Sequence, residues 1–330
     1  MIRLIRPTIT HRPEAEDRSY DLMICALGYE RRSRAAAERL RPGVVRGVAP
    51  AFDAQQVLSF EENKNWFASA GFETPTVTDA DFHAWVTALV HSVGDDRSGA
   101  LRLVVDISSF SRYRIACLVD VLRRHPLETP IVVDFIYSLA EYTAPTEEDS
   151  PNVHVGPVLD SFAGWSRDPD DRVSAIVGLG YETDRAVGAV EHVQASEVWV
   201  LSPLSPIAEY LTPLDEANRS LLDITADSHL LRYPVLDPLY TLSIVEGLAA
   251  RSLLSGNAVV FPFGPKIFAL VSLLSATVHP DLAVWRISPG VHAPPVERAP
   301  SEYWCELRAV WDPVTAIDWE AEAAAIASWY

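Results

Sequence analysis

The sequence predicts an α/β protein composed of two tandem Rossmann-like parallel-sheet sandwiches related by internal duplication. The tetrapeptide Leu-Gly-Tyr-Glu occurs twice, at residues 27–30 and 179–182. Short apolar runs rich in β-branched residues alternate with helical patterns in both halves, as in parallel sheets that are covered on both faces. The chain has 330 residues, more than a single hydrophobic core usually serves. We therefore expect one Rossmann-like repeat over residues 1–150 and a second over residues 151–330, the second ending in an added strand and helix.

The elements that follow the tetrapeptide recur in the same order in both halves, at offsets of about 150 to 158 residues. The expected pairs, first half and then second half, are a helix at 31–40 and 183–192, a strand at 44–52 and 197–206, a helix opening at 77–79 and 235–237, a strand at 101–110 and 257–266, a helix at 113–124 and 267–278, and a strand at 131–138 and 282–288. Residues 153–159, where the halves meet, predict an extra strand, residues 303–312 predict the matching extra strand of the second half, and residues 319–330 predict a closing helix. The alternative is that two unrelated α/β domains share a generic alternation of strands and helices.

Composition and charge limit the class of partner. Lys and Arg total 27 and Asp and Glu total 45, so the formal net charge is −18. Such a field repels phosphate backbones, which argues against long nucleic acid, whereas a few local basic groups can still hold a small anion. The three cysteines lie far apart in apolar runs, which argues against a disulfide framework: Cys25, Cys117 and Cys305. No apolar run reaches the length of a membrane span or a signal peptide, and we expect a cytoplasmic protein that contacts no membrane.

Ligands of open parallel sheets bind beyond the carboxyl ends of the strands, where loops and helix N-termini converge. Each tetrapeptide follows a predicted strand, and its glycine would let a ligand approach the backbone. A single glycine does not form the GxGxxG fingerprint, so we expect neither NAD nor FAD, and no other cofactor. The glutamate either matches the helix dipole or acts in catalysis, and the tyrosine either packs or stacks on a base. The ligand-binding candidates are Gly28, Tyr29 and Arg31, with Gly180, Tyr181 and Arg185, and the catalytic candidates are Glu30 and Glu182.

A second cluster of polar residues follows the predicted strand in the segment VVDISSFSRYR. Asp106, Ser108, Ser109, Ser111 and Arg112 crowd this turn. Hydroxyls and backbone amides here would form an anion cradle, with Arg112 as a charged clamp. The alternative is a serine N-cap, but a cap needs one hydroxyl and this turn has three. Asp106 is the third candidate catalytic residue.

The equivalent turn of the second half, FPFGPKIFAL, contains Gly264 and Lys266. Lys266 would reach a phosphate, although the GxxxxGK[ST] loop is absent. Two pairs of an asparagine and a basic residue suit ribose or phosphate contacts, although such residues are common in surface loops: Asn63 with Lys64, and Asn218 with Arg219. The nine histidines have no metal-ligand spacing, and we expect no metal site.

The strand-end motifs Asp-Ile-Ser-Ser followed by a basic residue, and Gly-Pro-Lys, resemble those of the CRISPR-associated Rossmann fold (CARF) family and its tandem relatives, the SAVED domains. The resemblance covers these two turns, within a strand-helix order that spans most of the chain. It implies a pseudo-two-fold cleft that binds a cyclic oligonucleotide messenger, which some members cleave, and a role in prokaryotic antiviral defence. It also implies ligand contacts at Asp106, Ser108, Ser109, Arg112, Gly264 and Lys266.

Three functions remain open from the sequence, and it does not decide whether the protein is an enzyme. The first is a binder or sensor of a small anionic, nucleotide-like ligand in the cleft between the halves. The second is an enzyme that hydrolyses a nucleotide or sugar phosphate with Glu30, Glu182 or Asp106 as general acid or base. The third is a non-catalytic subunit of a larger complex, docked through exposed aromatic residues near the C-terminus: Trp304, Trp311, Trp319, Trp329 and Tyr330.

Overall fold

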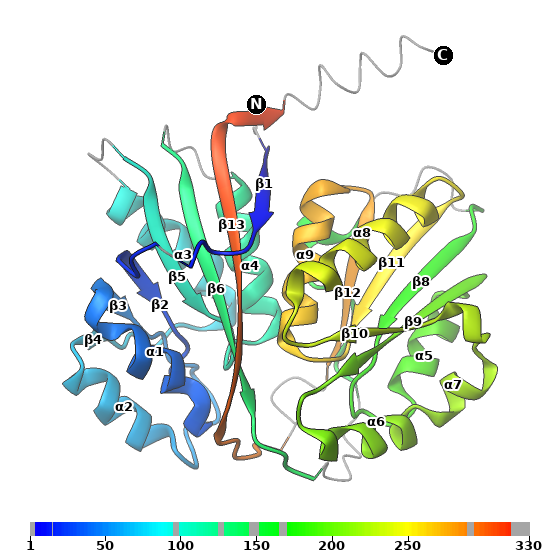
Figure 1. Ribbon diagram of the computed structural model, residues 1–330, viewed down its shortest axis with the longest axis horizontal. Coiled ribbons are helices and arrows are strands. Elements are labelled where there is room, and N and C mark those ends of the chain that lie inside the picture. The colour runs from blue at the N-terminus through cyan, green and yellow to red at the C-terminus, as the bar shows by residue number, and fades with distance from the viewer. Residues whose placement is uncertain are drawn as a thin grey trace.

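A computed structural model describes residues 4–14, 16–94, 99–124, 129–144, 152–164, 170–288 and 294–317. It contains two sheets of mostly parallel strands, each with helices on both faces (Figure 1). The predicted α/β class with two parallel-sheet sandwiches is therefore confirmed, whereas the duplication itself stays a prediction. The closing helix predicted at 319–330 lies outside the described residues.

The first sheet has seven strands in the spatial order β1-β13-β6-β5-β2-β3-β4. Strands β2 to β6 are parallel to one another, β13 is antiparallel to β6, and β1 is antiparallel to β13. Their bounds are β1 (Leu4–Thr10), β2 (Tyr20–Ile24), β3 (Val44–Val48), β4 (Phe72–Glu73), β5 (Leu101–Asp106), β6 (Ile131–Ala140) and β13 (Pro300–Ile317).

The second sheet has six strands in the order β10-β9-β8-β11-β12-β7. Strands β8 to β12 are parallel, and β7 is antiparallel to β12. Their bounds are β7 (His154–Pro157), β8 (Val173–Gly178), β9 (Glu197–Leu204), β10 (Leu230–Pro234), β11 (Asn257–Pro262) and β12 (Leu282–Ser288).

Both sheets have the same internal arrangement. The strand order reverses at β2 in the first sheet and at β8 in the second, and each sheet adds an antiparallel strand next to its last parallel one. The two Leu-Gly-Tyr-Glu segments follow β2 and β8, so they occupy equivalent places. Reversal points of this kind are where doubly wound sheets bind ligands.

The two extra strands were predicted correctly as strands, but the one predicted for the second half belongs to the first sheet. The strand predicted at 153–159, where the halves meet, is β7, which pairs with β12 of the second sheet. The strand predicted at 303–312 for the second half is β13, which pairs with β6 and β1 of the first sheet. Residues 300–317 therefore join the first sheet, in contrast to the predicted division at residue 150. Alternation of residue types indicates a strand, but the pairing partner depends on contacts distant in sequence.

The helices form three layers, one between the sheets and one on each outer face (Figure 1). Between the sheets lie α3 (Asp79–Gly94), α4 (Arg112–Arg124), α8 (Pro238–Leu253) and α9 (Lys266–Val278). The outer helices are α1 (Ala35–Leu40) and α2 (Phe60–Ser69) on the first sheet, and α5 (Arg185–His192), α6 (Leu211–Ala217) and α7 (Arg219–Ile224) on the second. Short 3₁₀ helices also occur: η1 (Arg31–Arg34), η2 (Arg41–Gly43), η3 (Asp160–Phe162), η4 (Ala208–Tyr210) and η5 (Asp227–His229).

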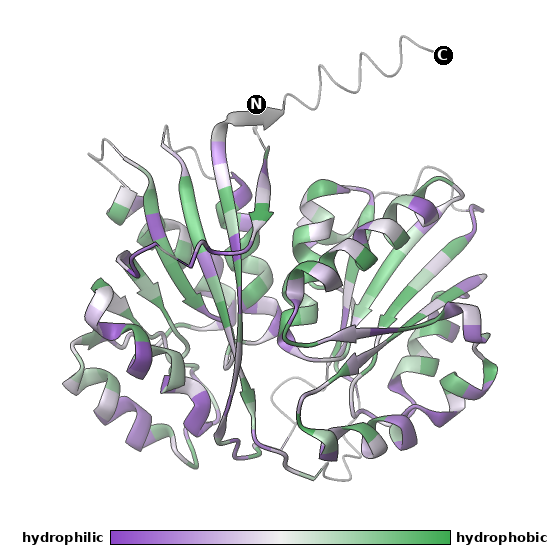
Figure 2. Ribbon diagram, viewed as in Figure 1, coloured by the Kyte–Doolittle hydropathy of each residue, from purple (hydrophilic) through white to green (hydrophobic). Residues whose placement is uncertain are grey.

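One hydrophobic core spans both sheets through the middle layer of helices. Phe82 of α3, Phe268 of α9 and Trp311 of β13 all belong to it, so the two units do not have separate inner cores. In Figure 2 the sheet strands are mostly hydrophobic, and the outer helices carry the hydrophilic segments. The shared core fixes the two sheets relative to each other and brings their carboxyl edges together. No helix of the described ranges combines the length and apolar character that a membrane span requires.

Candidate functional site

The carboxyl edges of the two sheets meet where α4 and α9 begin. Arg112, the first residue of α4, donates from Nη2 to the carbonyl oxygens of Phe263 and Gly264, the latter at 2.9 Å. Lys266, the first residue of α9, donates from Nζ to the carbonyl oxygen of Ser108 at 2.6 Å. Each unit therefore places the first cation of a helix against the strand-helix loop of the other unit. We call this reciprocal pair of contacts the rim contact.

Further charged groups surround the rim contact. Glu30 Oε2 accepts a hydrogen bond from Arg32 Nε at 2.5 Å, and Glu30 Oε1 lies 3.7 Å from Arg298 Nε. Both Glu30 and Arg32 are buried. The side chains that interact electrostatically here form what we call the rim cluster: Glu30, Arg32, Asp106, Arg112, Lys266 and Arg298. Four of its six members are basic residues, in a chain whose net charge is −18.

Lys266 shows the electrostatic consequence most clearly. The pKa of Lys266 is lowered to about 7, mainly by burial, because the charged ammonium loses its hydration, and also by the positive charges of Arg32, Arg112 and Arg298. The Glu30 carboxylate opposes this shift but does not cancel it. The local excess of positive charge would favour a bound anion, and an anion would in turn favour the protonated lysine.

Asp106 ends β5 and is fully enclosed. Its Oδ1 accepts a hydrogen bond from the backbone amide of Ser108 at 2.9 Å, while Oδ2 is buried without a hydrogen-bond partner. Burial raises the pKa of Asp106 to about 6, against the opposing effects of Ser108, Arg32 and Lys266. This carboxyl group therefore changes protonation state near neutral pH, unlike an ordinary aspartate.

The three serine hydroxyls of the predicted anion cradle have different tasks. Ser111 Oγ accepts from the amide of Arg114 at 3.2 Å at the start of α4. Ser108 Oγ accepts from the amide of Ser138 at 2.8 Å and so ties β5 to β6. Ser109 Oγ is buried without a partner. Of the three hydroxyls predicted to bind an anion, Ser109 alone therefore remains a candidate, because those of Ser108 and Ser111 support the local structure.

The asparagines predicted as ligand contacts instead hold the Gly-Tyr-Glu loops. Asn63 Nδ2 donates to the carbonyl oxygens of Gly28 and Glu30, each at 2.9 Å. Asn218 Nδ2 donates to the carbonyl of Gly180 at 2.7 Å. Both asparagines are buried, and neither lies in a surface loop as expected. In both units, a buried asparagine side chain therefore holds the loop after the central strand, which is β2 in the first and β8 in the second.

The basic partners of these asparagines do not reach the rim. Lys64 is half-exposed on α2 beside Glu61, and Arg219 is exposed as the first residue of α7. Arg31 is likewise exposed, and its backbone amide donates to Glu297 Oε1 at 2.7 Å. Arg185 begins α5 on the outer face of the second sheet. None of these four cations is among the groups that act on Glu30, Asp106 or Lys266, so they do not belong to the rim cluster.

The predicted glycines allow two backbones to approach each other rather than a ligand. A Cβ on Gly180 would lie 2.6 Å from the carbonyl oxygen of Phe263, and a Cβ on Gly264 would lie 2.6 Å from that of Leu179. The two loops of the second unit are thus packed together at van der Waals distance. Gly28 is less crowded, since its nearest neighbour would be Ser109 Cβ at 3.4 Å.

The two repeated glutamates have different surroundings, although their loops are equivalent. Burial would raise the pKa of Glu30, but Arg32, Lys266 and Arg298 hold it below its ordinary value. Glu30 therefore stays ionised and is unsuited to act as a general acid. Glu182 Oε2 turns back over Gly180, 2.3 Å from where a Cβ there would stand. Only the first of the two glutamates belongs to the rim cluster.

Aromatic side chains lie beside the rim cluster, and the sequence did not point to most of them. The Arg32 guanidinium lies 6.0 Å from the centre of the Tyr137 ring, which is buried. The ring of Tyr181 lies 5.6 Å from that of Tyr210, and Tyr210 lies 5.2 Å from Tyr142. The Tyr210 hydroxyl donates to the carbonyl of Glu141 at 2.8 Å, which joins the second unit to the chain after β6. Tyr29, by contrast, packs on the outer core of the first unit.

Four residues of this region were missed by sequence reasoning: Arg32, Tyr137, Tyr210 and Arg298. Arg32 is the second residue after the repeated tetrapeptide, in the run Glu-Arg-Arg, a signal that could have been used. Arg298 comes from the connection before β13, where no motif marks it. Its backbone carbonyl accepts from the amide of Arg32 at 3.1 Å, so this pairing arises only in the fold.

The predicted docking surface of C-terminal aromatic residues is not supported where it can be described. Trp311 is 1% exposed and belongs to the core, because β13 is an interior strand between β1 and β6. Trp304 is half-buried, with the guanidinium groups of Arg18 and Arg39 at 5.2 and 5.4 Å from its ring. Trp319, Trp329 and Tyr330 lie outside the described residues.

No protein-family model matches the chain, and no curated protein matches it significantly. Among solved structures it is similar to the cytoplasmic domain of a prokaryotic cation chloride cotransporter, at 7% identity and a TM-score of 0.21, over 83% of this chain and 97% of that one. A score this low supports no functional argument. Within the described residues, no group of three or more His, Cys, Asp or Glu side chains is placed to hold a metal ion.

Proposed function

We propose that the protein binds a small anionic, nucleotide-like ligand at the rim cluster and acts as a binder or sensor. The observation that supports this most is the rim contact, in which Arg112 and Lys266 bind backbone carbonyls across the junction. A carbonyl oxygen neutralises a cation less well than an anion does, so phosphate oxygens would form stronger hydrogen bonds with both groups. An anion here would therefore compete directly for donors that now hold the two units together.

The charge and chemistry of the surroundings favour a phosphate attached to an aromatic base. Arg112 Nε and Ser109 Oγ are buried donors without partners, as expected where a ligand completes the hydrogen bonding. Tyrosine rings lie around the same junction, and aromatic faces stack on bases without regard to their identity. The cationic groups are few and local, which agrees with a small ligand rather than a long nucleic acid.

Calorimetry and thermal unfolding with AMP, adenosine and inorganic phosphate test this proposal. We expect AMP to bind and to raise the melting temperature, with adenosine and phosphate each at least about tenfold weaker because each makes only part of the contacts. Lys266→Met should weaken AMP binding by about tenfold or more. Lys64→Met is the matched control, because this lysine is exposed on α2. Equal losses in both variants, or no binding of AMP, would contradict the proposal.

Hydrolysis of a nucleotide or sugar phosphate is a second candidate, favoured by one observation. Asp106 combines a pKa of about 6 with an unpartnered Oδ2, the properties of a general acid or base at neutral pH. If the protein turns its ligand over, Asp106→Asn should abolish product formation while AMP still binds. Persistence of the product at an unchanged rate in this variant would remove Asp106 from the reaction. The cytoplasmic location and the antiviral role stay predictions.

A further inference from the structure

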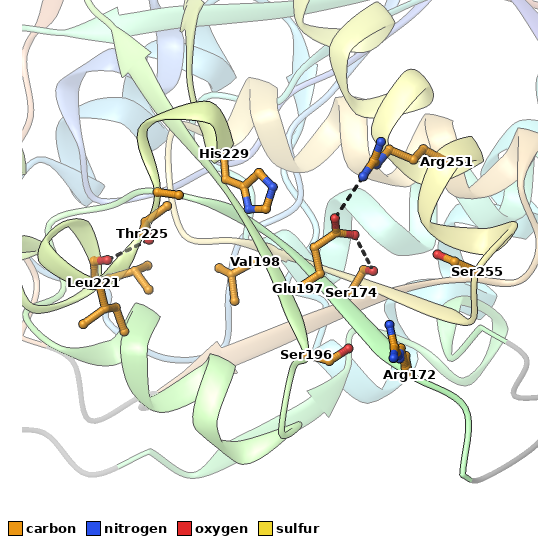
Figure 3. A pocket seen from close by; sticks show the side chains of 12 residues that line it. Arg172, Ser174, Ser196, Glu197, Val198, Leu221, Thr225, His229, Arg251 and Ser255 are labelled. Atoms are coloured by element: carbon orange, nitrogen blue, oxygen red, sulfur yellow. Dashed lines mark hydrogen bonds and ion pairs between the residues drawn. The ribbon is translucent and has the colours of Figure 1, made fainter.

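A cavity of about 800 Å³ lies at the other edge of the second sheet, beside the amino ends of β8 and β9 (Figure 3). Its wall includes Arg172 just before β8, Glu197 at the start of β9 and Arg251 near the end of α8. The rim cluster lies at the opposite, carboxyl edge of this sheet, where Lys266 follows β11, so the two places are separated by the length of the strands. The volume falls within the range of about 300–1,000 Å³ that is typical of small-molecule sites.

Two guanidinium groups determine the charge of this cavity. Arg251 Nη2 pairs with Glu197 Oε1 at 3.2 Å, which leaves its other N–H groups for a further acceptor. Arg172 is exposed, and its side chain has no hydrogen bond or ion pair within the described part of the chain. Among the described residues that line the cavity, Glu197 is the one carboxylate. Two guanidinium groups against one carboxylate leave the cavity with one excess positive charge. The imidazole of His229, whose ring centre lies 4.1 Å from that of Trp199, adds a further polar group.

The hydroxyl groups of the wall already donate their protons to protein oxygens. These donations run from Ser174 to Glu197 Oε2 at 3.1 Å, from Thr225 to the Leu221 carbonyl at 2.7 Å, and from Ser255 to the Ser252 carbonyl at 3.0 Å. A hydroxyl has one proton and two lone pairs, so these oxygens are left as acceptors. The wall therefore donates through its cations and accepts through its hydroxyls and Glu197, which suits a ligand that has both an anion and hydroxyl groups.

We propose that this cavity binds a phosphorylated polyol, with its phosphate between Arg172 and Arg251 and its hydroxyls donating to the oxygens of the wall. Guanidinium groups bind phosphate through two parallel hydrogen bonds. Ser174, which is 4% exposed, and Arg251 hold the Glu197 carboxylate in place as an acceptor. The site does not depend on the function of the rim cluster.

Titration calorimetry of the full chain with glucose 6-phosphate, glucose and inorganic phosphate tests the ligand class. Glucose 6-phosphate should bind, glucose should not, and inorganic phosphate should bind at least about tenfold more weakly because it lacks the hydroxyls. Equal affinities for glucose 6-phosphate and inorganic phosphate would refute the claim that the wall recognises the hydroxyls of the ligand. No binding of glucose 6-phosphate would overturn the proposal altogether.

Variants locate the binding. Arg172→Gln and Arg251→Gln should each lower the affinity for glucose 6-phosphate by about tenfold to a hundredfold, since each removes charged hydrogen bonds. Arg232→Gln is the matched control, because Arg232 is exposed on β10 and does not line the cavity. Within the described residues the Arg172 side chain makes no hydrogen bond or ion pair, so Arg172→Gln should fold normally, and an unchanged affinity in it would refute the site. Loss of glucose 6-phosphate binding in Lys266→Met would place the probe at the rim cluster and would also refute it.

Discussion

Binding of an anion at the rim cluster should draw a proton onto Lys266. With a pKa of about 7 in the free protein, this lysine is protonated in about one molecule in ten at pH 8. An anion beside the ammonium would return the group toward its ordinary value of 10.5, so nearly every bound molecule would hold the proton. The expected uptake at pH 8 is therefore about 0.9 proton per ligand, and affinity should fall almost tenfold between pH 8 and pH 9.

Calorimetry with AMP in Tris and in HEPES at pH 8 measures the uptake, because the two buffers release different heats when they give up a proton. At pH 8 the phosphate of AMP is fully ionised and Asp106, with a pKa of about 6, has lost its proton, so neither group contributes. Lys266→Arg is the informative variant, since arginine keeps the charge at every accessible pH. It should bind AMP without proton uptake and with the same affinity at pH 8 and pH 9. A wild-type protein that takes up no proton, or a Lys266→Arg variant with the wild-type pH dependence, would refute this reasoning.

Three further predictions concern stability and are measured by urea unfolding. Asn63→Leu and Asn218→Leu should each lower the free energy of unfolding by about 1–3 kcal/mol, because each leaves a loop carbonyl without its donor. Unequal losses in the two variants would argue against equivalent roles of the two asparagines. Gly180→Ala should destabilise through its clash with the adjacent loop, whereas Gly188→Ala, in the open interior of α5, should stabilise by about 0.5–1 kcal/mol. Trp311→Ala should lower the free energy of unfolding by about 3–5 kcal/mol, and a loss below about 1 kcal/mol would contradict the place of Trp311 in the core.

The central strands and the middle helices could be predicted from the sequence because burial on both faces leaves a strong pattern. The runs at 101–110, 131–138 and 282–288 consist mainly of apolar residues, and they match β5, β6 and β12. The outer helices leave a weaker pattern. In α2 only Phe60, Asn63 and Phe67 are buried, so most of the segment is polar and its Asn-Lys pair was interpreted as a loop.

Edge elements escaped prediction for a related reason. No strand was predicted at β1, although Leu4–Thr10 pairs with β13 from end to end, with one register shift between Ile5 and Pro7. β4 has two residues and therefore almost no pattern of its own. Their positions follow from pairing with strands distant in sequence, which a single sequence does not encode locally.

The candidate site was predictable in part. The serine-rich turn and Lys266 were identified, and the structure brings them into contact across the junction. Two of the three hydroxyls turned out to support the backbone, which residue type alone could not reveal. Arg298 joins the cluster only because the connection before β13 returns to the first unit. The geometry of a composite site depends on such long-range pairings.

The two strand-helix turns at the rim have complementary chemistry, and this has a measurable consequence. The first turn supplies Asp106, Ser109 and Arg112, and the second supplies carbonyl acceptors and Lys266. If Arg112 and Lys266 act as parts of one contact, removing the first should change the effect of removing the second. A cycle of Arg112→Met, Lys266→Met and the double variant should therefore give a coupling free energy of unfolding of about 0.5–3 kcal/mol. If the losses in the two single variants add up to that of the double variant within about 0.3 kcal/mol, Arg112 and Lys266 hold the units independently. An anion would then have no single shared contact to displace.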